Sequence, residues 1–122
     1  MVDDDQDDQE IFRQGVKAVD ESINCIMFNS SEELMKALKK KHDNLPDFIF
    51  LDLNMPKISG LECLRNIKSI SHYKNILVYV YSTSSTLKDI NECREAGAVG
   101  FLVKPTSLIT LKENLRKILK PG

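Results

Sequence analysis

The stretch FIFLDLNMP at residues 48–56 decides the fold. Four apolar residues in a row, with no polar interruption, predict a strand that is buried on both faces of a parallel sheet. The run ends at the carboxylate of Asp52, and the turn residues Asn54 and Pro56 follow at once. In an open α/β sheet, reacting groups gather beyond the carboxyl ends of the strands. Asp also initiates turns, so the role of Asp52 depends on which other residues reach it.

The rest of the chain alternates between strand-like and helical patterns. Apolar runs that predict strands lie at residues 25–28, 48–51, 76–81 and 99–103. Apolar residues at helical spacing lie at residues 8–21, 34–38, 60–67, 87–97 and 108–119. This alternation predicts a doubly wound, five-stranded parallel sheet with helices on both faces. Only Met1 and Val2 remain to form its first strand, which is shorter than a strand usually is.

Several helix ends carry their own signals. Ser30 and Glu33 form the S-x-x-E pattern of a capping box, so a helix should begin directly after Ser30. Ser84 and Ser85 are expected to cap the next-to-last helix, and Gly97 is expected to end it.

Composition restricts the class of protein. A chain of 122 residues with 42% hydrophobic residues fits one domain. It has no apolar run long enough for a membrane span and no secretory signal, which predicts a cytoplasmic protein without a membrane partner. A formal net charge of −1 gives no reason to expect a nucleic-acid partner. The unpaired spacing of Cys25, Cys63 and Cys93 predicts reduced thiols within the core.

Polar residues follow four of the predicted strands. They are Asp3-Asp4, Asp52, Ser82-Thr83 and Lys104-Pro105. Because the carboxyl ends of parallel strands meet at one edge of the sheet, these groups should converge on one crevice. The remaining acids of the first ten residues, Asp5, Asp7, Asp8 and Glu10, are interpreted as surface charges that favour the start of a helix.

Together these segments resemble the receiver domain of two-component response regulators. The resemblance rests on DDD at 3–5, FIFLDLNMP with Gly60, VYS in 79–82 and GFLVKP at 100–105, in that order. It covers the whole chain, so residues 1–122 are expected to form one receiver domain of the flavodoxin-like type, without an output domain.

The resemblance implies a role for each matching residue at the phosphorylation site. Asp52 would accept the phosphoryl group, and Asp3 and Asp4 would hold Mg²⁺, or Mn²⁺, together with Asp52. Asn54 would offer its backbone carbonyl to the metal. The same chemistry follows from the residue types, because Mg²⁺ prefers oxygen ligands. Without it, mutual repulsion among the carboxylates should raise at least one pKa.

Further residues would carry the response to phosphorylation. By the same resemblance, Ser82 is the hydroxyl that moves toward the phosphoryl group, and Lys104 is the lysine that pairs with it. Phe101 occupies the aromatic switch position, although an aromatic residue in a strand is usually core. The Lys104–Pro105 peptide is expected to be cis. The changed surface would be the face formed by the last two helices and the strand between them.

The expected partners are a sensor histidine kinase or a histidine phosphotransfer protein, and an unidentified downstream protein. The chain is thus expected to be a signalling protein and not an enzyme. One alternative is a degenerate receiver that binds proteins without phosphorylation. Another is an aspartate-nucleophile phosphohydrolase, which would need a second acid where Asn54 stands.

Overall fold

The central sheet contains three parallel strands in the order β1-β2-β3. A computed structural model describes residues 1–40, 44–83 and 86–120. The strands are β1 (Phe48–Asp52), β2 (Leu77–Ser82) and β3 (Gly100–Val103). Four of the five residues of β1 are buried, as expected of a strand covered on both faces. The prediction of three parallel strands in this part of the chain is therefore confirmed.

Two further segments extend the sheet beyond β1, each through a single residue pair. Val2 pairs in parallel with both Phe28 and Leu51. Its amide donates to the carbonyl of Phe50 at 2.8 Å, and its carbonyl accepts from the amide of Asp52 at 2.9 Å. On the other side, the amide of Asp3 donates to the carbonyl of Phe28 at 3.0 Å. The doubly wound order is thus as predicted, but the first two strands are reduced to single residue pairs in the described residues.

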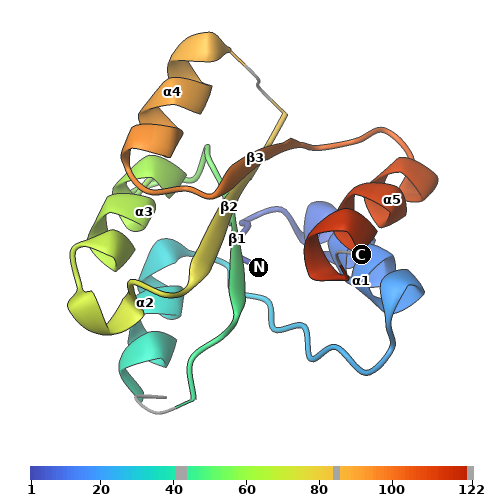
Figure 1. Ribbon diagram of the computed structural model, residues 1–122, viewed down its shortest axis with the longest axis horizontal. Helices are drawn as coiled ribbons and strands as arrows, with labels where there is room; N and C mark the ends of the chain where they lie inside the picture. The colour runs from blue at the N-terminus through green and yellow to red at the C-terminus, as the bar shows by residue number, and fades with distance from the viewer. Residues whose placement is uncertain (41–43, 84–85, 121–122) are drawn as a thin grey trace.

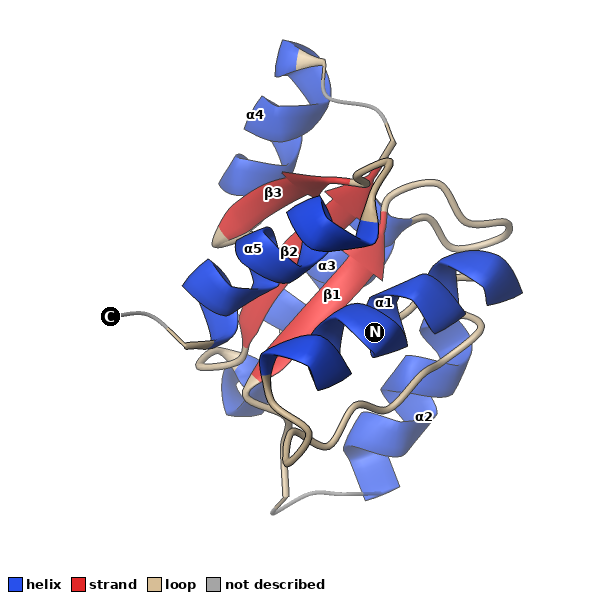
Figure 2. Ribbon diagram, turned by 90° about the vertical axis from the view of Figure 1, so that its right-hand side faces the viewer, coloured by secondary structure: helices blue, strands red, loops and turns tan. Residues whose placement is uncertain are grey.

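Helices cover both faces of the sheet. Figure 1 shows helices on either side of the sheet, and Figure 2 is viewed from one of these sides, with helices in front of the strands. On the first face lie α1 (Gln6–Val19) and α5 (Leu108–Leu119); on the second lie α2 (Ser31–Lys40), α3 (Gly60–Lys68) and α4 (Leu87–Glu95), with a short 3₁₀ turn at Ser71–Tyr73. None of the helices within the described ranges is long and apolar enough to cross a membrane.

Capping residues fix where the first two helices begin. Helix α1 starts two residues earlier than predicted, because the Asp5 carboxylate accepts hydrogen bonds from the amides of Asp7 and Asp8. The Ser30 hydroxyl accepts from the amide of Glu33 at 3.2 Å, as a capping box requires. The Glu33 carboxylate accepts in turn from the amide of Asn29, one residue before the cap.

A threonine caps the start of helix α4, and a glycine ends it. The predicted caps Ser84 and Ser85 lie outside the described residues, and the Thr86 hydroxyl caps the helix by accepting from the amide of Asp89. At the other end, Gly97 has φ +108°, a left-handed conformation that favours glycine. The amides of Gly97 and Ala98 donate back to the carbonyls of the last helical turn, which is a Schellman motif. Gly97 is therefore the helix stop that the sequence predicted.

The two helical layers produce two apolar cores. One lies between the sheet and α2, α3 and α4, and the other between the sheet and α1 and α5. Cys63 and Cys93 are buried in the first core, and Cys25 is half-buried beside the second. All three cysteines are free, as predicted.

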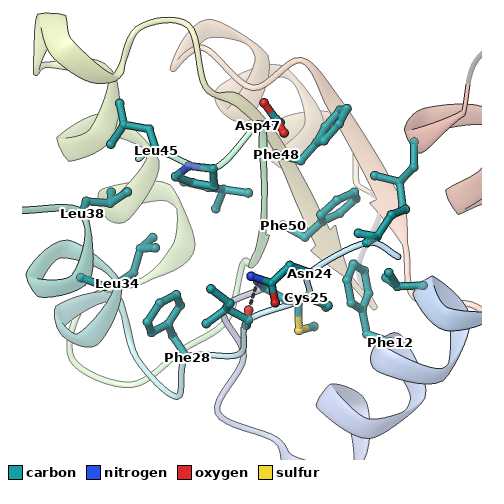
Figure 3. A pocket seen from close by; sticks show the side chains of 18 of the residues that line it. Phe12, Asn24, Cys25, Phe28, Leu34, Leu38, Leu45, Asp47, Phe48 and Phe50 are labelled. Carbon is teal, nitrogen blue, oxygen red and sulfur yellow. Dashed lines mark hydrogen bonds between the residues drawn. The ribbon is translucent and has the colours of Figure 1, made fainter. Parts of the chain in front are cut away.

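An apolar pocket of about 480 Å³ opens at the amino end of β1 (Figure 3). Phe48 and Phe50 of β1 line it together with Phe12 of α1, Leu34 of α2 and the segment 22–26. The amino group of Met1 lies in its wall and donates to the carbonyl of Ile26 at 2.8 Å. Burial lowers the pKa of this amine.

Candidate functional site

Four predicted site residues meet at the carboxyl edge of the sheet. Asp52 is the last residue of β1, Ser82 is the last of β2, and Lys104 directly follows β3. Asp3 follows the residue that pairs with β1, and its side chain is fully buried. Asp52 is 6% exposed and Ser82 is fully buried. These residues therefore converge at one edge of the sheet, as expected.

The ammonium group of Lys104 lies at the centre of this cluster. Its Nζ is 2.9 Å from Oδ2 of Asp3, 2.8 Å from Oδ2 of Asp8 and 3.4 Å from Oδ1 of Asp52. The backbone holds the lysine in place, because the Lys104 amide donates to the carbonyl of Ser82 at 2.8 Å. Only 10% of the lysine side chain is exposed. One cation thus joins carboxylates from three separate segments of the chain.

Burial and charge alter the acidity of two of these groups. Burial and, to a smaller extent, the nearby carboxylate of Asp3 raise the pKa of Asp52 to about 6, against the opposing effect of Lys104. Burial would lower the pKa of the Lys104 ammonium, but its hydrogen bonds to Asp8 and Asp3 outweigh burial and raise it. The lysine therefore remains charged at neutral pH. Asp52 has the raised pKa that was expected of at least one carboxylate, but burial is a larger cause than the expected repulsion from Asp3.

Three carboxylates at the edge could hold a divalent cation. Asp3, Asp4 and Asp52 each offer one oxygen, and these oxygens lie within 4.8 Å of one another. Asp4 is exposed whereas the other two are buried, so the group is open to solvent on one side only. Hard oxygen ligands with room for water fit Mg²⁺ or Mn²⁺. Asn54 is exposed, and its backbone amide donates toward Asp52 and lowers the pKa of that residue.

Two aromatic residues flank the site on the neighbouring strands. The ring centroid of Tyr81 lies 5.5 Å from Nζ of Lys104. Burial raises the pKa of the Tyr81 phenol to about 12, with Asp8 and Asp3 adding to the effect, so it stays protonated at neutral pH. Phe101 pairs with Val80 in the β2–β3 ladder and is half-buried against the core beneath α2, α3 and α4.

The loop after β1 lies tightly against Asp52. The Gly60 amide donates to the carbonyl of Leu53 at 2.9 Å. A Cβ atom on Gly60 would lie only 2.2 Å from the carbonyl oxygen of Asp52, so this position has no space for a side chain. Lys57, in the same loop, has φ 63°, which is uncommon for a residue other than glycine.

Asp8 and Gln9 belong to the site although the sequence interpretation left them out. Asp8, interpreted as a surface charge, is an ion-pair partner of Lys104. The Gln9 amide donates to the backbone carbonyl of Asp3 at 2.6 Å and to the side chain of Asn29 at 2.8 Å. The spacing of Asp8 could have indicated that it lies on the buried side of its helix, because the buried residues Phe12 and Val16 follow it at intervals of four.

The expectation of a cis peptide at Lys104–Pro105 is wrong. Within the described part of the chain no peptide bond is cis. The trans form is the lower-energy isomer before proline by about 0.5–1 kcal/mol. In this isomer Lys104 already reaches three carboxylates, so its contacts do not require the cis form.

Comparison with known proteins identifies the family of this chain. Residues 1–116 match the family described as the response regulator receiver domain. The chain belongs to this family. The receiver domain is 35% identical over 98 residues to the chemotaxis protein CheY-3 of Vibrio cholerae, covering 76% of this chain and 74% of that protein. It is 27% identical to CheY of Pseudomonas aeruginosa, covering 93% and 92%.

Solved structures agree with this assignment. The phosphorylated cyanobacterial phytochrome response regulator RcpA has a TM-score of 0.87 at 26% identity, covering 99% of this chain and 92% of that one. The Mn(2+)-bound form of the response regulator Rcp1 has a TM-score of 0.85 at 24% identity, covering 99% and 93%. The receiver fold is thus shown, and the protein takes part in two-component signalling as response regulators do. Members of the family bind Mg²⁺ or Mn²⁺ at an acidic pocket, and interact with histidine kinases and downstream targets.

Proposed function

We propose that this receiver domain accepts a phosphoryl group on Asp52 from a sensor histidine kinase or a histidine phosphotransfer protein in the cytoplasm. The observation that supports this most directly is the convergence of Asp3, Asp52 and Lys104, with Nζ of Lys104 3.4 Å from Oδ1 of Asp52. Aspartate carboxylates act as nucleophiles when aspartyl phosphates form. The phosphohydrolase alternative lacks its second acid, because Asn54 stands at that position.

The transfer is a displacement at phosphorus. A carboxylate oxygen of Asp52 forms the new bond to phosphorus, while the bond to the donor's histidine nitrogen breaks and leaves its electron pair on that nitrogen. With a pKa of about 6, Asp52 is mostly ionised at pH 7 and attacks without first losing a proton. Lys104 neutralises charge on the phosphoryl oxygens. Mg²⁺ or Mn²⁺ at Asp3, Asp4, Asp52 and the backbone carbonyl of Asn54 would supply further neutralisation of this charge.

The phosphorylated state would change the surface through two side chains. A phosphoryl group adds about two negative charges at the strand ends. The Ser82 hydroxyl turns toward it and vacates space, and Phe101 rotates inward from its half-buried position. The face formed by α4, β3 and α5 then changes its affinity for a downstream protein. Each of these elements exposes apolar side chains, namely Leu87 of α4, Val103 of β3, and Leu108 and Ile109 of α5.

Mass spectrometry after incubation with acetyl phosphate and Mg²⁺ tests the acceptor. The wild type should gain the mass of one phosphoryl group, and Asp52→Asn should gain none. Asp47→Asn is the matched control, because Asp47 is an exposed carboxylate directly before β1, away from the site. It should be modified as the wild type is. Equal modification of Asp52→Asn would refute the assignment, and no modification of any variant would favour the degenerate receiver.

Nuclear magnetic resonance with beryllofluoride, a mimic of the phosphoryl group, tests the switch. Amide resonances of α4, β3 and α5 should shift when the mimic binds to the wild type. Phe101→Ala should still bind the mimic, with smaller shifts on that face. Unchanged shifts in Phe101→Ala would show that the aromatic side chain does not transmit the change.

A further inference from the structure

The carboxylate of Asp8 differs from the other two that contact Lys104. Asp3 and Asp52 belong to the group of oxygens that could hold a divalent cation, whereas Asp8 does not. Asp8 lies in the first turn of α1, and 32% of its side chain is exposed. Its contact with Nζ, at 2.8 Å, is the shortest of the three. Asp8 is therefore a partner that Lys104 can keep when the other carboxylates are engaged elsewhere.

The ammonium group of Lys104 lies closer to the carboxylates of Asp3 and Asp8 than to that of Asp52. Nζ lies within hydrogen-bond distance of Asp3 and Asp8, but 3.4 Å from Oδ1 of Asp52. An ammonium group is a compact charge on a flexible stem, so its position depends on the acceptors around it. Without the carboxylate of Asp8, Lys104 would keep its hydrogen bond to Asp3, move closer to Asp52 and compete with a cation for the oxygens of Asp52.

We propose that Asp8 is a positioning residue that holds Lys104 back from Asp52 and so leaves the Asp52 carboxylate accessible to a cation and to a phosphodonor. This proposal rests on the proposed function for its biological meaning. Its physical content is a competition between two cations for one group of carboxylates, and this can be measured without a phosphodonor.

Calorimetric titration of the full chain with Mg²⁺ measures this competition. Asp8→Asn should raise the Mg²⁺ dissociation constant about three- to tenfold, because the freed lysine pairs with the ligand oxygens. Asp7→Asn is the matched control, since it removes the same formal charge from the same helical turn at an exposed residue. It should change the constant less than about twofold, because exposed charges are screened by solvent and salt. Asp8→Glu, which keeps the charge, should stay near the wild type.

A double-mutant cycle separates positioning from general electrostatics. In a Lys104→Met background, Asp8→Asn should weaken Mg²⁺ binding no more than Asp7→Asn does. Circular dichroism melting confirms that each variant is folded, and Asp8→Glu tests the charge alone if Asp8→Asn is unstable. Equal effects of Asp8→Asn and Asp7→Asn, or an effect of Asp8→Asn that persists without Lys104, would overturn the proposal. Because no phosphodonor is present, a failure of Asp52 to accept phosphate would leave this result unaffected.

Discussion

The two ends of the short segment Met1–Asp3 have opposite surroundings. At Asp3, the buried carboxylate contacts Lys104, and the side chain of Gln9 holds the backbone carbonyl. At Met1, the buried amino group lies in the wall of an apolar pocket of about 480 Å³. One end is thus closely packed and polar, whereas the other leaves space unfilled. Val2, which lies between them, pairs with Leu51 of β1.

The two ends therefore differ in how their contacts affect the stability of the fold. At the carboxyl edge, buried charges and tight backbone contacts are maintained although burying an ionised carboxylate is costly. At the amino end, the side chains that line the apolar pocket lack packing partners across it. The polar contacts of the site thus adjoin an apolar pocket at the other end of the same short segment.

The largest expected effect tests the tightness of the carboxyl edge. Gly60→Ala should lower the free energy of unfolding by about 2–4 kcal/mol, because its Cβ would meet the backbone of Asp52. Urea denaturation measures the change. Gly15→Ala is the control within a helix: its Cβ would meet the flexible side chains of Leu111 and Leu115, so the loss should be under about 1 kcal/mol. Equal losses of unfolding free energy in the two variants would show that the backbone around Gly60 accommodates an added methyl group as easily as the contact between α1 and α5 does.

A smaller effect tests the electrostatic cost of the same edge. The pKa of Asp52 is raised to about 6, so the folded state holds its proton more tightly than the unfolded state and this group destabilises the fold above that pH. Asp52→Asn should therefore stabilise the protein by about 1–3 kcal/mol at pH 7 in the presence of EDTA. The gain should shrink as the pH falls from 6 to 4. A gain that is equal at pH 7 and pH 4.5 would show that ionisation is not its cause, and Asp47→Asn should change little at either pH.

The smallest effect tests the space at the amino end. Adding three β-branched apolar residues before Met1 should raise the free energy of unfolding by about 1–2 kcal/mol, because they would fill the pocket and move the charged amine to another position. Thermal melting compares this variant with one that carries a Gly-Ser-Gly extension, which supplies the same length without apolar side chains. If both extensions give the same melting temperature, the pocket does not accept a strand.

The sequence predicted those parts of the site that follow from strand ends. An apolar run that ends in a polar residue gives both the strand and the edge, so Asp52, Ser82 and Lys104 could be placed together before any coordinates. The helix stop at Gly97 was also predictable from the sequence, because glycine adopts a left-handed conformation more easily than other residues do.

Contacts between helices and strand ends could not be predicted in the same way. Asp8 looked like one of several acids at the start of a helix, and its partner is 96 residues away in the sequence. The direction in which the first turn of α1 points depends on the packing of Phe12 against Phe50 and Tyr81, which local patterns do not contain. The isomer of the Lys104–Pro105 peptide could not be predicted from local patterns either. The cis form was inferred from the family resemblance, and no local signal in this chain specifies the isomer.

The ring of Tyr81 near Lys104 has an optical consequence. The chain contains no tryptophan and only three tyrosines, so its ultraviolet emission comes from phenol rings. Tyr81 is buried beside the charges of the site, whereas Tyr73 lies at the 3₁₀ turn and Tyr79 is half-buried on the same face of β2, two residues farther from the strand end. A change of charge at Asp52 or Lys104 should therefore alter the emission of one phenol out of three. The protein carries its own fluorescent reporter, and kinetic experiments on the site need no added dye.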